Sequence, residues 1–98
     1  MIRSFRDAGT EDIFNGADTK QARKACPSAV WKVARRKLEL LDSARNLNDL
    51  RVPRANQLEA LKKDRAGQHA LRVNAQYRVC FVWTALGPAE VEIVHYHS

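Results

Sequence analysis

The chain has 98 residues, of which 45% are hydrophobic and 29% charged, and its formal net charge is +6. This length and composition are typical of a globular protein, so we expect residues 1–98 to fold as a single domain. The apolar runs are too short to cross a bilayer, the start lacks the apolar segment of a secretory signal, and two cysteines supply no disulfide framework, so we expect a cytoplasmic location.

The positive charge is concentrated near the middle of the chain. Residues 20–45 carry eight lysines and arginines against only two acids, Glu39 and Asp42. Such a surface is either simply solvated or attracts a polyanion, of which nucleic acid is the commonest. Charge alone does not distinguish DNA from RNA.

The first half of the chain is mainly helical in pattern. Ile2–Phe5 could form an edge or lead-in strand, and Thr10 followed by two acids predicts the N-cap of a short helix that Asn15-Gly16 ends. Residues 17–25 lack clear periodicity, so we expect a mobile surface loop there. Helical spacing resumes over residues 27–44. Its apolar stripe consists of Val30, Val33, Ala34, Leu38, Leu41 and Ala44.

The opposite face of this long helix is basic. Lys32, Arg35, Arg36 and Glu39 occupy it, and the face is either solvated or available to RNA. Lys37 falls near the apolar stripe. We expect its alkyl chain to lie along the buried edge while its ammonium group reaches solvent.

The second half of the chain predicts strands joined by turns. Residues 47–50 predict a short helical turn, and Leu58–Leu61 follow an extended connector. The later segments, residues 69–73, 77–84 and 91–96, have the β-branched and aromatic character of strands. Two helices followed by consecutive strands predict an α+β fold in which the helices pack on one face of an antiparallel sheet.

The apolar pattern selects one register for the central hairpin. A three-residue loop, Asn74–Gln76, places Leu71 opposite Val79 and gathers the apolar side chains on one face. On the other face, Arg72 then lies opposite Arg78. Like charges at this spacing disfavour the sheet, so the two arginines either share an anion, splay into solvent or pair with acids of the last strand.

The last third of the chain also carries the side chains that metal-free phosphodiester chemistry requires. Cations neutralise phosphate charge, and imidazoles transfer protons near neutral pH. The candidates are Lys62, Lys63, Arg65, Arg72, Arg78, His95, Tyr96 and His97. We expect neither a metal nor a cofactor, because no third ligand accompanies the two terminal histidines and the glycines form no phosphate-binding loop.

Several of these segments together resemble the HigB-type toxins, the plasmid-maintenance "killer protein" branch of the RelE toxin superfamily. The resemblance spans nearly the whole chain and is carried by Leu-Glu-Ala-Leu-Lys at 58–62, Asp-Arg-Ala-Gly-Gln-His at 64–69, residues 72–81, and Val-His-Tyr-His at 94–97. It implies a RelE-like, small, mainly antiparallel sheet with two N-terminal helices packed on one face.

The function that the resemblance implies is that of a type II toxin. Such a toxin is a ribosome-dependent mRNA endoribonuclease, which cuts mRNA in the ribosomal acceptor site and inhibits translation. The implied partners are the ribosome, mRNA and a HigA-like helix-turn-helix antitoxin, through which the complex binds promoter DNA. The alternative is a weakly active or inactive relative that acts mainly as an antitoxin-binding module in this autoregulatory complex.

The family motif also implies roles for single residues. His97 matches the terminal histidine, an acid or base, and Tyr96 matches a tyrosine that stacks on a base or orients the sugar-phosphate. Lys62 matches a lysine that stabilises developing charge, and Arg78 is expected to grip phosphate. The surrounding phosphate-binding group comprises Arg65, Arg72, Lys63 and His95.

Two positions depart from the family pattern. Many relatives have an acid before the Tyr-His pair, where this chain has His95, and some have a histidine where this chain has Glu59. Proton-transfer roles at these positions therefore do not carry over. His95 either transfers a proton itself or packs beside Val91 and Ile93, whose alternation it shares.

Overall fold

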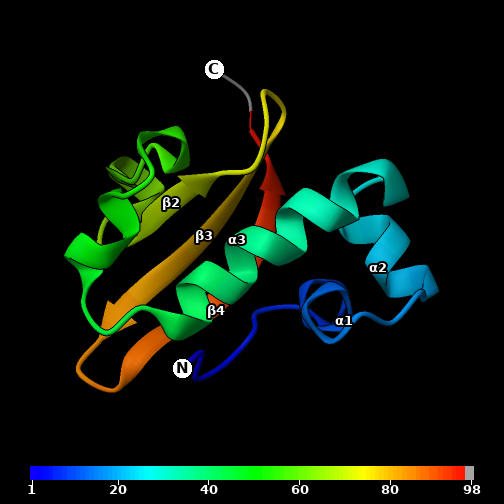
Figure 1. The fold of residues 1–98 in the computed structure, drawn as a ribbon, viewed down its shortest axis with the longest axis horizontal. Coiled ribbons are helices and arrows are strands. Elements are labelled where there is room, and N and C mark those ends of the chain that lie inside the picture. The colour runs from blue at the N-terminus through cyan, green and yellow to red at the C-terminus, as the bar shows by residue number, and fades with distance from the viewer. Residues whose placement is uncertain (97–98) are drawn as a thin grey trace.

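The computed structural model describes residues 1–96, which form three α-helices and a four-stranded sheet (Figure 1). The helices are α1 (Ala8–Asn15), α2 (Lys20–Ala25) and α3 (Trp31–Ser43). The strands are β1 (Glu59–Ala60), β2 (His69–Arg72), β3 (Tyr77–Thr84) and β4 (Gly87–His95). Neighbouring strands are antiparallel in the order β1-β2-β3-β4, and α3 packs across β3 and β4. The predicted α+β class is confirmed.

The short helix α1 begins before the predicted N-cap. Asp7 caps it by accepting the backbone N–H of Thr10 at 2.9 Å, so the prediction that Thr10 is the N-cap was wrong. The Thr10 hydroxyl is fully buried, donates to Asp7 at 2.7 Å and accepts the backbone N–H of Ile93 at 3.0 Å. This one side chain therefore ties α1 to β4. Gly16, with a left-handed φ of 77°, ends the helix as predicted.

The prediction of a loop over residues 17–25 was wrong, because most of this segment forms α2. The Thr19 hydroxyl caps α2 by accepting the N–H of Ala22 at 3.0 Å, and it donates to Asp12 of α1 at 2.7 Å. Ala22 is fully buried, and a Cβ at Gly9 would clash with the backbone carbonyl of Gln21. Small residues thus let the two helices approach closely, and this packing replaces the apolar periodicity that the sequence lacks.

The predicted stripe of α3 is largely buried. Ala34, Leu38 and Leu41 are fully buried at the i, i+4, i+7 spacing of one helix face. Val33 lies to one side of that row and is 36% exposed, so its assignment to the stripe was wrong. The basic side chains predicted on the opposite face are exposed.

Lys37 follows a different course from the one predicted. Its ammonium group does not simply reach solvent but donates to the side-chain oxygen of Asn56 at 2.6 Å. Asn56 is fully buried, and its amide in turn donates to the carbonyls of Leu50 and Val52. Burial, followed by the charges of Arg36 and Arg72, lowers the pKa of Lys37.

The central hairpin has the predicted register. Leu71 pairs with Val79, and Arg72 pairs with Arg78. The side-chain oxygen of Asn74 stabilises the three-residue loop by accepting the N–H groups of Gln76 and Tyr77, each at 2.8 Å. The sheet face towards the helices buries Leu71, Val73, Val79, Phe81, Val91 and Ile93.

The two outer strands differ from the prediction. The two-residue strand β1 was not among the three predicted strands, and β4 starts at Gly87 instead of Val91 because a tight turn over residues 85–86 closes the hairpin. The Thr84 hydroxyl fastens that turn by donating to the Gly87 carbonyl at 2.6 Å. The predicted strand at Ile2–Phe5 is reduced to one parallel bridge between Phe5 and Val91. Among residues 1–96, no helix combines the length and the apolar character that a membrane crossing requires.

Candidate active site

A cleft of about 300 Å³ lies on the sheet face that points away from α3. Side chains alternate along β3, so Arg78 and Cys80 point to this face while Val79 and Phe81 point to the core. We refer to it as the open-face cleft. It is lined by Leu61, Arg65, Ala70, Arg78, Cys80, Val94, His95 and Tyr96.

Arg78 occupies an unusual position in the open-face cleft. Its side chain is only 13% exposed, and its guanidinium carbon lies 4.1 Å from the centre of the Tyr96 ring. Its Nε and Nη1 atoms are buried and have no hydrogen-bond partner among residues 1–96, and the Glu59 carboxylate is 4.0 Å from Nη1. Buried donors without acceptors are costly, so an anion in this cleft would satisfy them.

Arg65 also lines the cleft and is held by an acid of β4. Its Nη1 donates to the Glu92 carboxylate at 2.9 Å and to the Gln68 side chain at 3.0 Å. The hydrogen bond to Glu92 raises the pKa of Arg65. Glu92 thereby links the loop after β1 to the last strand. Within residues 1–96, no ion pair joins Arg72 or Arg78 to an acid of β4. The β4 acid Glu92 pairs with Arg65 instead.

The remaining predicted cations lie outside the cleft lining. Lys62 and Lys63 are exposed on the turn between β1 and β2, and Leu61 and Arg65 on either side of them line the cleft. Arg72 is half-buried and pairs with Arg78 across the hairpin, but it does not line the cleft. Its positive charge contributes to the lowered pKa of Lys37. The structure therefore separates the two hairpin arginines in environment despite their shared register.

The terminal segment is described as far as Tyr96. Tyr96 is half-buried, and its backbone N–H donates to the Gln76 carbonyl at 2.6 Å. His95 is exposed, and its ring meets the Tyr77 ring edge-on, with centroids 5.1 Å apart, so it is not buried beside Val91 and Ile93. His97, predicted as the catalytic histidine, lies outside the described residues.

Sequence reasoning missed two features of the sheet, one beside the cleft and one on the core face. Glu92 as the partner of Arg65 left no local signal, because the two residues are 27 positions apart. His69 is half-buried, stacks on Phe81 with ring centroids 6.1 Å apart, and has a buried Nδ1 without a partner among residues 1–96. Its place at the end of the Asp-Arg-Ala-Gly-Gln-His motif was a signal, but that motif alone assigns His69 no contact.

Cys80 lies in the cleft wall but is unsuited to act as a nucleophile. It is buried, and this burial raises the pKa of its thiol, although the neighbouring charges of Arg65 and Arg78 act in the opposite direction. A thiol with a raised pKa is mostly protonated near neutral pH and reacts slowly. Within residues 1–96, no three His, Cys, Asp or Glu side chains are grouped so as to hold a metal ion.

What the cleft can do follows from these groups. The guanidinium groups of Arg65 and Arg78 and the phenol ring of Tyr96 line a space of a size suited to a phosphodiester, and the exposed Lys62 and Lys63 lie between the lining residues Leu61 and Arg65 in the sequence. Arginine forks bind phosphate oxygens and stabilise added negative charge. The arrangement is therefore suited to gripping and polarising a phosphodiester.

Comparison with known proteins identifies the family of the chain. Residues 3–97 match the family described as the RelE-like toxin of type II toxin–antitoxin system HigB. The chain is 39% identical over 83 residues to Toxin HigB-1 of Vibrio cholerae, covering 85% of this chain and 84% of that toxin. It is also 38% identical over 77 residues to an uncharacterized protein of Haemophilus influenzae, covering 79% of this chain and 73% of the other. The chain therefore belongs to the HigB-like family of RelE-like toxins from type II toxin–antitoxin systems.

Proposed function

We propose that this toxin is a ribosome-dependent endoribonuclease, which cleaves mRNA in the ribosomal acceptor site and so stops translation. A RelE-like toxin family implies endoribonuclease activity in general. The observation that carries the proposal is Arg78, a nearly buried guanidinium that packs on Tyr96 and has unsatisfied donors in the open-face cleft. A phosphate of the RNA backbone would supply the missing acceptors.

The proposed reaction uses the ribose next to the scissile phosphate and needs no metal. The 2′-hydroxyl loses its proton and attacks phosphorus, the bond from phosphorus to the 5′-oxygen breaks, and that oxygen leaves with a proton. The products are a 2′,3′-cyclic phosphate and a 5′-hydroxyl. Arg78 and Arg65 bind the phosphate oxygens, Lys62 stabilises the added charge, Tyr96 stacks on a base, and His97 transfers a proton.

The charges around the cleft support dependence on the ribosome. Arg65 is paired with Glu92, and Arg78 lies 4.0 Å from Glu59, so each arginine faces an acid. Affinity for a phosphate backbone grows with the number of cations that are not already compensated. The cleft alone should therefore bind free RNA weakly. A ribosome that already holds the mRNA would supply the missing affinity.

We also propose the identity and role of the antitoxin. A type II toxin has a protein antitoxin as its partner, and we expect a HigA-like helix-turn-helix protein here. The complex would then bind its own promoter through the antitoxin. Sequencing the adjacent gene tests this directly, because a neighbour without a helix-turn-helix segment would contradict it.

Alanine substitutions at Lys62 and His97 test the catalytic proposal. Expressed without antitoxin, Lys62→Ala and His97→Ala should each abolish growth arrest, whereas Arg54→Ala, at an exposed position outside the cleft, should arrest growth like the unmodified toxin. Circular dichroism and antitoxin binding should be unchanged in all three. Full toxicity of both Lys62→Ala and His97→Ala would show that the site is assigned wrongly.

A second candidate function has one observation in its favour. The acids Glu59 and Glu92 beside the two cleft arginines weaken phosphate binding, which suits a weakly active relative that serves mainly as an antitoxin-binding module. Growth of cells that express the unmodified toxin alone distinguishes the two functions. Unchanged growth with intact ribosome-bound transcripts supports the second function, and arrest with cut transcripts supports the first.

A further inference from the structure

A second depression lies on the helical side of the molecule, between the end of α1 and the outer face of α3. It consists of two adjoining hollows of about 500 and 740 Å³, which share Arg35, Arg36 and Glu39. We refer to it as the α1–α3 groove. No lining residue is common to this groove and the open-face cleft. A segment bound in the groove would therefore contact residues other than those that line the proposed RNA site.

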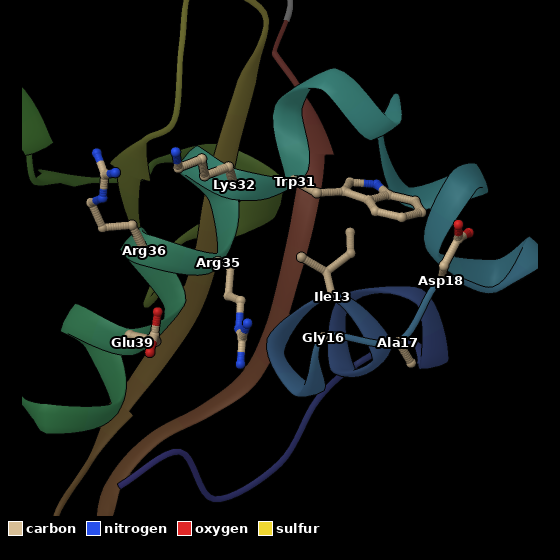
Figure 2. A pocket seen from close by; sticks show the side chains of 9 residues that line it. All are labelled: Ile13, Gly16, Ala17, Asp18, Trp31, Lys32, Arg35, Arg36 and Glu39. Carbon is tan, nitrogen blue, oxygen red and sulfur yellow. The ribbon is translucent and has the colours of Figure 1, made fainter.

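The floor of the α1–α3 groove is apolar and firmly held. Ile13 is only 2% exposed, and Figure 2 shows it beneath the indole ring of Trp31. The indole N–H donates to the Cys26 carbonyl at 2.9 Å, and Arg35 donates from Nε to the Phe14 carbonyl at 3.2 Å. The aromatic ring and the groove wall are thereby fixed before any partner binds. Preformed apolar floors of this kind favour large apolar side chains of a partner.

The rim of the groove is positively charged. Residues 20–45, with eight cations and two acids, account for the whole net charge of +6, so the rest of the chain has nine of each sign. Lys32 and Arg36 are exposed and project from α3 away from α1 in Figure 2. Within residues 1–96, neither of them forms an ion pair or a side-chain hydrogen bond. Their charge is available to an acidic partner.

The lining argues for a protein partner rather than for RNA. Phosphates of an RNA backbone gain nothing from the apolar floor that Ile13 and Trp31 form, whereas large apolar side chains of a polypeptide pack on such a floor. A polypeptide segment with one or two large apolar side chains between carboxylates matches both the floor and the rim. We propose that the α1–α3 groove binds such an acidic, apolar segment of the antitoxin. This inference rests on the antitoxin partner of the family and not on RNA cleavage.

Charge reversal at the rim tests the inference by binding alone. The dissociation constant between the full-length toxin and its purified antitoxin should rise at least about tenfold in Lys32→Glu/Arg36→Glu, and the loss should shrink as salt is added. The matched control is Arg51→Glu/Arg54→Glu, which changes the charge equally at exposed positions outside the groove and should bind as the unmodified toxin does.

A neutral variant separates shape from charge. Ala17 lines the groove, so Ala17→Tyr should fill part of it and weaken antitoxin binding about tenfold or more without changing the charge. Circular dichroism of each variant checks the fold. Unchanged antitoxin affinity in both folded groove variants would overturn the inference. Loss of ribosome binding with unchanged antitoxin affinity would also overturn it and would assign the groove to RNA.

Discussion

The open-face cleft and the α1–α3 groove are charged in different ways. In the cleft, Arg65 and Arg78 each face a glutamate, and the space between them is lined by an aromatic ring and a buried thiol. At the groove, Lys32 and Arg36 project from a helix with no acid paired to either within residues 1–96.

This difference suggests a division of tasks between the two faces. Partly buried cations that are paired with acids act at short range, where their positions relative to a reacting phosphate matter most. Uncompensated exposed cations act at long range and raise the rate of association with an acidic partner. A small toxin can therefore keep its net charge away from its proposed reaction site, provided that the ribosome delivers the RNA.

The largest effect should come from the two hairpin arginines, which share a register but not an environment. Arg78→Ala should reduce the rate of cleavage of ribosome-bound mRNA by about 10²–10³, because it removes a phosphate donor from the cleft. Arg72→Ala, the matched control outside the cleft, should cost less than about fivefold. Similar losses for both variants would show that both arginines contact the substrate.

The next effect concerns Thr10, whose buried hydroxyl connects α1 to β4. Thr10→Val keeps the shape of the side chain but removes the acceptor of the Ile93 N–H, so the free energy of unfolding should fall by about 1–3 kcal/mol. Thr10→Ser keeps the hydroxyl and should lose only about 1 kcal/mol through the missing methyl group. Urea unfolding measures both variants. Equal stability of the two would mean that the buried hydrogen bonds contribute little.

A smaller effect is expected from the acid that holds Arg65. Glu92→Ala should lower the cleavage rate about fivefold, equivalent to about 1 kcal/mol, because Arg65 is partly exposed and the ion pair is partly screened. Glu90→Ala, at an exposed position in the same strand, is the control and should leave the rate unchanged. A faster Glu92→Ala enzyme would mean that the carboxylate competes with phosphate instead of positioning Arg65.

The last prediction concerns the two thiols, for which no role in cleavage or antitoxin binding is proposed. Burial raises the pKa of Cys26 to about 11 and also raises that of Cys80. A raised thiol pKa reduces the thiolate fraction at a given pH, so at pH 8 Cys26 should react with iodoacetamide about a hundredfold more slowly than in urea, and Cys80 should also react more slowly than in urea. Mass spectrometry follows the reaction. Rapid modification of Cys80 would indicate that the cleft wall opens readily.

Much of the sheet could be predicted from the sequence because its pattern is local. Alternation along residues 77–84 and a short loop predicted the pairing of Leu71 with Val79. This register places Arg72 directly opposite Arg78. Alternation could not distinguish their environments. The cleft depends on Arg65 meeting Glu92 across the sheet, a contact between distant residues that no local pattern encodes.

The helical half was harder to predict where packing uses small residues. The segment that forms α2 has no apolar stripe, and it is ordered by Thr19 and by the close approach that Gly9 permits. The buried bond between Lys37 and Asn56 was missed for a similar reason, because burial of an ammonium group depends on an acceptor 19 residues away.

One measurement tests the central claim most directly. A defined mRNA is incubated with purified toxin, either free or positioned in ribosomes with a known codon in the acceptor site, and the new 5′ ends are mapped. Ribosome-dependent cleavage predicts cuts at that codon in the ribosome-bound mRNA and almost none in the free mRNA. Equal cutting of free mRNA, or intact mRNA in the ribosomes, would contradict it.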